Sequence, residues 1–270
     1  IVTALAPAGE AGVARSEPPA ISLAEWERGV VIRPREARDR AMYLWFYEWT
    51  FFDAIARGEH ARGTFRFDRR FEADGRQAVL TSSMLELKVT ACDDGADLAL
   101  RVSNRSGHDW PELAALAPCF NPGLRQKVGG RLAPRSPQLA DLAEQHTYFV
   151  GARGLTPLRT RAIHFNQRLW SAVAAHAVAG RLSFSEKWPS SPDHACGGLL
   201  VRESEDGAWV TGIYWEDYLA VQGHNPWHCL HAAVRIGPLK RGESRLVRGR
   251  VYLFKGTRDD VLRRYRAAHP

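Results

Sequence analysis

The stretch from residue 84 to residue 104 reads MLELKVTACDDGADLALRVSN and decides the fold class. Leu85, Leu87 and Val89 alternate with polar residues before an Asp-Gly pair at 94–95, and the alternation resumes after that pair. Alternation with a period of two indicates a strand that buries one face, and glycine accepts the positive φ of a tight turn. The stretch therefore predicts a β-hairpin.

Two other segments have the same pattern, at 64–83 and 197–216, with Asp-Gly pairs at 74–75 and 206–207. Near the end of the chain, strands are expected over 229–237 and 245–256, followed by a short helix over 257–268. Three hairpins favour an antiparallel sheet over a parallel α/β fold. We therefore predict a mainly β protein, an antiparallel β-sandwich, with few helices.

One of those helices is expected near the N-terminus, over the aromatic segment 34–57. Pro34 suits the first turn of a helix and Gly58 suits the position after its end. At helical spacing Glu48 lies in the middle of an aromatic face. A strand over 42–52 is the alternative, because aromatic residues favour strands. A second helical segment is expected from residue 170 to residue 182.

The domain organisation follows from length and composition. With 270 residues and 45% hydrophobic residues, the chain can form one large core. Residues 1–20 are rich in alanine, proline and glycine, which favours a leader or the remnant of an export signal. Residues 21–270 are expected to form a single β-sandwich domain with helical additions. We expect the protein to be exported.

The net charge of +7 comes entirely from the end of the chain, because residues 235–270 alone carry +8. Such a charge run is usually a solvated face. No zinc-finger, RNP or P-loop pattern supports nucleic acid as a partner. No run of 18 apolar residues predicts a transmembrane helix. The four cysteines, which form no CxxC pair, leave open whether they are disulfides or free thiols: Cys92, Cys119, Cys196 and Cys229.

Three histidines close to one another, His224, His228 and His231, form the most conspicuous cluster of titratable residues. They suggest a site for one divalent metal ion, or a catalytic base. Pro226 prevents one helix from carrying all three, so a strand that begins near His228 is preferred. In that strand a row from Leu230 to Ile236 faces the core, and Cys229 and His231 face the other way. Structural histidines are the alternative.

Aromatic and acidic residues near predicted turns are the other candidates for binding or catalytic residues. Indole rings stack on the apolar faces of sugars. Trp110, Trp215 and Trp227 are therefore expected to bind a carbohydrate, although tryptophans that fill the core are the alternative. The same role is assigned to His108 and Tyr218. Glu48 and Glu216 are candidate acids, because cleavage of a glycosidic bond needs carboxyl groups. An ion pair with one of the many arginines is the alternative for Glu48.

The segments GPLKRGES (237–244) and GRVYLFKG (249–256) form a Gly-Glu turn followed by a last strand. Together with VSNRSGHDWP (102–111), a strand followed by a loop with tryptophan, they resemble the galactose-mutarotase-like β-sandwiches. The resemblance implies a fold found in carbohydrate-active epimerases, polysaccharide lyases and glycosidase domains.

Our leading hypothesis is therefore an exported enzyme that cleaves or isomerises a glycan by acid/base chemistry. A glycoside hydrolase, a polysaccharide lyase and a sugar epimerase all fit it. One alternative is a carbohydrate-binding or surface-interaction module without catalysis. The other is a metal-dependent enzyme that uses the three histidines.

Overall fold

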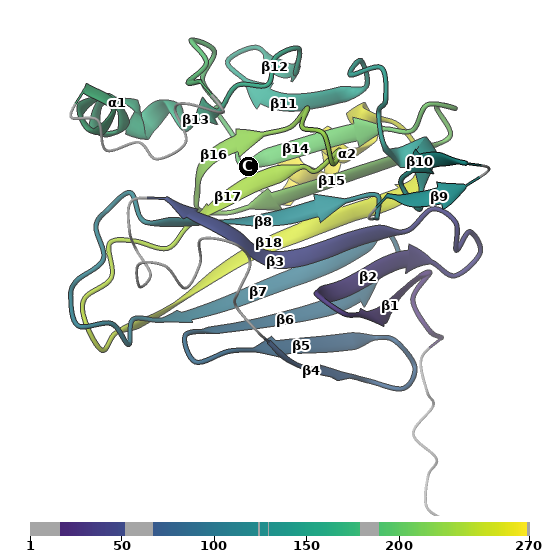
Figure 1. Ribbon diagram of the computed structural model, residues 1–270, viewed down its shortest axis with the longest axis horizontal. Helices are drawn as coiled ribbons and strands as arrows, with labels where there is room; N and C mark the ends of the chain where they lie inside the picture. The colour runs from purple at the N-terminus through teal and green to yellow at the C-terminus, as the bar shows by residue number, and fades with distance from the viewer. Residues whose placement is uncertain (1–16, 52–66, 124, 129, 179–188, 269–270) are drawn as a thin grey trace, which may run out of the picture.

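Two antiparallel sheets face each other in the computed structural model (Figure 1). It describes residues 17–51, 67–123, 125–128, 130–178 and 189–268. The predicted antiparallel β-sandwich is confirmed. No helix in this part of the chain is long and apolar enough to cross a membrane. The predicted leader over 1–20 lies mostly outside the described residues.

The larger sheet has nine strands in the order β12-β11-β14-β15-β18-β7-β6-β5-β4. The three hairpins with Asp-Gly turns pair as predicted, as β4–β5, β6–β7 and β14–β15. The strands have these bounds: β4 (Asp68–Phe71), β5 (Gln77–Thr81), β6 (Leu85–Cys92), β7 (Gly95–Ser103), β11 (Thr147–Gly151), β12 (Gly154–Pro157), β14 (Leu199–Glu203), β15 (Trp209–Trp215) and β18 (Ser244–Lys255).

The smaller sheet has seven strands in the order β1-β2-β3-β8-β17-β16-β13. A two-stranded ribbon lies beside it, made of β9 (Gln126–Val128) and β10 (Arg131–Ala133). The seven strands have these bounds: β1 (Ile21–Trp26), β2 (Gly29–Pro34), β3 (Met42–Phe51), β8 (Ala115–Asn121), β13 (His164–Phe165), β16 (Tyr218–Gln222) and β17 (His231–Arg235).

The aromatic segment forms strand β3, so the predicted N-terminal helix is wrong. Met42 and Leu44 are fully buried in the core between the sheets, whereas Tyr43 packs against Trp26 on the opposite face. This alternation has a period of two, and β3 bonds to β2 on one edge and to β8 on the other. Aromatic side chains stabilise such a two-sided strand. Residues 52–57 of the predicted helix lie outside the described residues.

The helices lie on the outer faces of the sandwich. Helix α1 (Trp170–Val178) and the 3-10 turn η2 (Gln167–Leu169) pack near β13, where a helix is predicted. Helix α2 (Arg258–Ala268) packs on β14 and β15 through Val261, and Figure 1 shows it behind these strands. A second 3-10 turn, η1 (Pro137–Leu139), precedes β11. The predicted C-terminal helix is thus confirmed.

Candidate functional site

A line of side chains crosses the outer face of the seven-stranded sheet, away from the core between the sheets. Trp45 of β3 pairs with Cys119 of β8, and His231 of β17 pairs with Gln222 of β16. The register between β8 and β17 sets Cys119 opposite His231. Side chains of the adjacent positions fill the core between the sheets: Leu44, Phe120, Leu230 and Val221.

This arrangement confirms the alternation expected for the last strands. The row from Leu230 to Ile236 lies in the core, and Cys229 and His231 share the opposite face. The outer face is covered at one end by α1 and at the other by a cluster around Tyr43. The line of polar side chains lies between these two covers.

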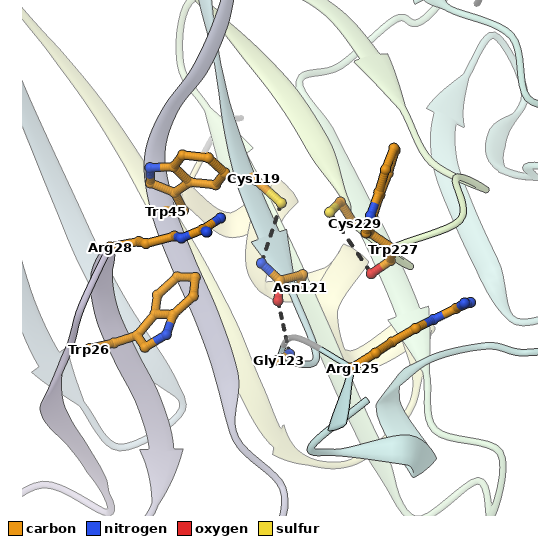
Figure 2. A pocket seen from close by; sticks show the side chains of 9 residues that line it. All are labelled: Trp26, Arg28, Trp45, Cys119, Asn121, Gly123, Arg125, Trp227 and Cys229. Carbon is orange, nitrogen blue, oxygen red and sulfur yellow. Dashed lines mark hydrogen bonds between the residues drawn. The ribbon is translucent and has the colours of Figure 1, made fainter. Parts of the chain in front are cut away.

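A cavity of about 240 Å³ opens over this part of the sheet (Figure 2). Figure 2 shows Trp26, Trp45 and Arg28 on one side, Trp227 and Arg125 on the other, and the two thiol groups and Asn121 between them. The guanidinium of Arg28 lies 4.9 Å from the ring centre of Trp45. Cys119, Asn121, Gly123 and Cys229 complete the lining. Among the described residues, the lining of this cavity includes two cations and no carboxylate.

Trp227 reaches the cavity because the loop before β17 is fixed by Asn225. The Asn225 Oδ1 atom accepts hydrogen bonds from the backbone N–H groups of Trp227 (3.2 Å) and Cys229 (3.0 Å). Its Nδ2 atom donates to the carbonyl of Cys229 at 2.8 Å. The loop thereby presents an indole that is 57% exposed. An ordered, exposed ring at a cavity mouth is available to a ligand.

Arg202 of β14 supports the same loop from beneath. Its side chain is 1% exposed, and its guanidinium donates to the carbonyl groups of His228 (2.7 Å) and Leu139 (3.2 Å). A third bond goes to the Thr147 hydroxyl at 2.9 Å, which donates to Asp141 at 2.6 Å. Burial lowers the pKa of Arg202 to about 10, so the guanidinium is charged at neutral pH.

His231 lies at the centre of the line, and its ring is oriented by Gln222. The Gln222 Nε2 atom donates to the carbonyl of Gly223 at 2.7 Å, so its Oε1 atom must act as the acceptor for His231 Nδ1, also at 2.7 Å. His231 Nδ1 therefore carries the proton, and Nε2 carries the lone pair. Such a histidine can act as a base or as a metal ligand.

The structure does not bring the three predicted histidines together as metal ligands. His224 has φ +53°, and its Nε2 atom bonds to the carbonyl of Leu158. His228 Nε2 lies 3.2 Å from a guanidinium nitrogen of Arg125. Burial, together with Arg202 and Arg125, lowers the pKa of His228 to about 4, and burial also lowers that of His224. Among the described residues, the potential ligands that converge are His231 and two cysteines.

Two of the predicted sugar-binding tryptophans lie in the core instead. Trp110 is 2% exposed and donates from Nε1 to the Ser106 hydroxyl at 3.0 Å. Trp215 is 1% exposed and belongs to the core between the sheets. These two assignments are therefore wrong, because the strands and their register bury both rings. Predicted His108 lies on an exposed loop beside Trp110, and it does not line the tryptophan cavity.

Glu216 and Tyr218 line a second, polar cavity of about 490 Å³. Glu216 accepts a hydrogen bond from the backbone of Arg248 at 2.7 Å, and the Tyr218 hydroxyl donates to the carbonyl of Ala195 at 3.0 Å. Asp217 forms ion pairs there with Arg235 and Arg245, each at 2.7 Å. Each of these three side chains thus bonds to partners of its own, and none of these bonds joins Glu216 to Tyr218. Glu48 lies in β3, and the structure describes only its backbone.

Several residues of the tryptophan cavity were not predicted as site residues. Trp26, Trp45 and Arg28 all line the cavity, and no sequence pattern singled them out as site residues. Cys119 and Asn121 belong to β8, whose sequence ALAPCFN lacks clear alternation because every residue of the strand is buried. Two sequence signals point to part of this site: Trp227, which is expected to bind a carbohydrate and lines the cavity, and the shared parity of Cys229 and His231.

No protein-family model matches the chain, and no curated protein matches it. Similar solved structures include a galactose mutarotase-like protein from Lactobacillus casei, with 11% identity, a TM-score of 0.48, and coverage of 88% of this chain and 98% of that one. A galactose mutarotase related enzyme from Lactobacillus acidophilus has 8% identity, a TM-score of 0.43, and coverage of 90% and 97%.

A polysaccharide lyase has 9% identity and a TM-score of 0.43, and the match covers 93% of this chain and 34% of the lyase. These descriptions agree with the resemblance predicted from the sequence. At such low identities and TM-scores, we infer function from the side chains of the cavity alone.

Proposed function

We propose that the protein binds a carbohydrate in the cavity between Trp26, Trp45 and Trp227. The observation that carries the proposal is the set of three indoles around one cavity, one of them 57% exposed. The CH faces of a pyranose ring stack on indole, and the nearby polar groups can bond to its hydroxyls. Arg28 and Arg125 supply such polar groups at the cavity.

The charge of the cavity favours an acidic sugar. Arg28 and Arg125 line it, and the lining side chains that the structure describes include no carboxylate. A guanidinium binds a carboxylate through two parallel hydrogen bonds, which gives both affinity and orientation. A uronic acid unit combines an apolar ring face with one carboxylate. We therefore propose a uronate-containing saccharide as the ligand, encountered by an exported protein.

Cleavage or isomerisation of that sugar is the second candidate function. Strand β3 carries Glu48 three residues after Trp45, and the pairing of β3 with β8 is irregular between Trp45 and Trp49. Irregular pairing of this kind often re-aims a side chain next to a site. In this proposal Glu48 acts as the acid, and His231 acts as the base in the metal-free protein.

Binding is tested by titrating uronate and neutral oligosaccharides while the tryptophan fluorescence is recorded. We expect uronate oligosaccharides to bind, and Trp227→Ala to weaken binding about tenfold, the equivalent of about 1.4 kcal/mol. Leu246→Ala is the matched control, because Leu246 is a 37% exposed apolar side chain on β18 of the other sheet. Unchanged affinity in Trp227→Ala, or the absence of any binding, would refute the proposal.

Catalysis is tested by assaying the same saccharides for new reducing ends, unsaturated products and altered anomers. Glu48→Gln should abolish turnover and leave sugar affinity within about twofold, because an acid contributes to the transition state. If wild-type protein binds a uronate saccharide and leaves it unchanged, the site is a binding site only.

A further inference from the structure

Two cysteines and one histidine from neighbouring strands converge on the outer face of the sheet. The sulfur atoms of Cys119 and Cys229 and a ring nitrogen of His231 all lie within 4.8 Å of one another. Around a tetrahedral zinc ion, with Zn–S near 2.3 Å and Zn–N near 2.05 Å, ligand atoms lie roughly 3.6–3.8 Å apart. Contraction by about 1 Å or less therefore produces ligand spacing that a zinc ion accepts.

From this geometry we propose that Cys119, Cys229 and His231 form a Zn²⁺ site with one open coordination position. Two thiolates and a neutral imidazole are typical ligands of zinc. Binding exchanges the two thiol protons for the metal ion, so two protons are released to solvent and the site becomes neutral. This set differs from the three histidines expected from the sequence, with which it shares only His231.

The surrounding hydrogen bonds orient the proposed ligands. Gln222 Oε1 accepts from His231 Nδ1, which leaves the Nε2 lone pair for the metal. Asn121 Nδ2 donates to the sulfur of Cys119 at 3.3 Å, a contact that stabilises a thiolate. Asn225 bonds to both backbone polar groups of Cys229 and fixes the strand entry. Each ligand is thus oriented by a neighbouring amide side chain.

The open position faces the tryptophan cavity, because both thiol side chains line it. A closed structural zinc site has four protein ligands, whereas a site with three ligands leaves room for water or for an oxygen of a bound molecule. The metal proposal does not depend on the sugar proposal. The titration below contains no saccharide, so failure of one leaves the other intact.

Cobalt is the probe for the test, because Co²⁺ accepts the same ligands as Zn²⁺ and absorbs visible light. The reduced, chelator-treated protein is titrated with CoCl₂. We expect one Co²⁺ to bind per chain, with visible absorption of the bound cobalt and a near-ultraviolet band from sulfur-to-cobalt charge transfer. Addition of one equivalent of ZnCl₂ should remove both absorption signals. A titration without a charge-transfer band would overturn the proposal.

Cysteine variants assign the band to the site. Cys119→Ser and Cys229→Ser should each weaken the charge-transfer band and lower the affinity at least tenfold. Cys92→Ser and Cys196→Ser are matched controls, since both thiols lie outside the cavity, and they should bind as wild type does. If either control variant loses the band while a cavity variant keeps it, the assignment is wrong.

His231→Gln and Gln222→Leu test the imidazole and its orientation. Loss of the bond to Nδ1 should weaken Co²⁺ binding roughly 10–100-fold in Gln222→Leu, with the band position unchanged. Circular dichroism of each metal-free variant shows whether it folds. If unfolded protein that was purified without reductant has only two reactive thiols, and peptide mapping assigns them to Cys92 and Cys196, Cys119 and Cys229 form a disulfide, which would overturn the proposal.

Discussion

Substitution of Arg202 by methionine should destabilise the protein strongly, because the arginine side chain is buried and bonds to buried and partly buried groups. Methionine keeps most of the volume and removes the charge. Two carbonyl groups, the buried one of Leu139 and the partly buried one of His228, then lose this donor. Asp141 is 1% exposed, and Arg202 is the one cation among the described groups that lower its pKa. The variant therefore leaves this buried carboxylate without that positive charge.

The size of the effect follows from these losses. Removing one partner of a buried charge pair costs about 3–5 kcal/mol, because the other charge is left uncompensated. Arg202 reaches Asp141 through the Thr147 hydroxyl, and that hydroxyl still donates a hydrogen bond to Asp141 in the variant. We therefore expect Arg202→Met to lower the unfolding free energy by about 4 kcal/mol, within this range. That is a large part of a typical stability of roughly 5–15 kcal/mol. Arg202→Lys keeps the charge and should cost less.

Urea unfolding of the wild type, Arg202→Met and the double variant Arg202→Met/Asp141→Asn measures this cost. Burial alone would raise the pKa of Asp141, but the Thr147 bond and Arg202 outweigh it and hold that pKa low. Loss of Arg202 removes one of the groups that lower the pKa of Asp141, so the folded variant takes up a proton at a higher pH than the folded wild type does.

The destabilisation caused by Arg202→Met should therefore be smaller at pH 5 than at pH 7. Asparagine tolerates the positive φ of Asp141 and removes the charge, so the double variant should recover part of the loss and show no such pH effect. A variant within 1 kcal/mol of the wild type, or a loss equal at both pH values, would refute this account of the buried arginine.

Two glycines of the predicted turns should differ in their tolerance of alanine. In Gly95→Ala the new Cβ would lie 1.8 Å from the carbonyl oxygen of Val251, and unfolding experiments should show a loss of about 3 kcal/mol or more. Gly207→Ala meets nothing within 4 Å and should lose only about 1–2 kcal/mol from its positive φ. Burial lowers the pKa of His164 below the unfolded value near 6.5, so its contribution to stability is present above pH 6.5 and is lost as the pH falls below it. In His164→Asn the drop in unfolding free energy between pH 7.5 and pH 5.5 should be smaller than in the wild type, and in the exposed-loop variant His108→Asn it should be unchanged.

The hairpins could be predicted because their information is local. An Asp-Gly pair and alternating residues on both sides specify a turn and two strands within about 20 residues. The aromatic segment of β3 has no such local pattern, because apolar side chains at consecutive positions fit a buried helix as well as a buried strand. Its neighbours β2 and β8 decide the outcome, and β8 lies about 70 residues further along the chain.

The candidate site could be predicted only in part, because it depends on the register between distant strands. Parity within one strand places Cys229 and His231 on the same face, and this inference needs no partner strand. The position of Cys119 opposite His231 follows only from the pairing of β8 with β17. The three histidines are close in sequence, but the turn at His224 and His228, both with positive φ, directs them to different partners.

The polar line across the sheet is costly for folding, and this cost itself favours a functional role. Cys119, Asn121, Gln222 and His231 are each at most 5% exposed, at the middle of a face that apolar clusters cover on both sides. Apolar residues at these positions would bury the same surface without any need for hydrogen bonds. Local departures from such packing are expected where a protein binds or reacts. Cys119 and Asn121 of this line also line the tryptophan cavity, so the ligand of the indoles and the proposed metal would meet there.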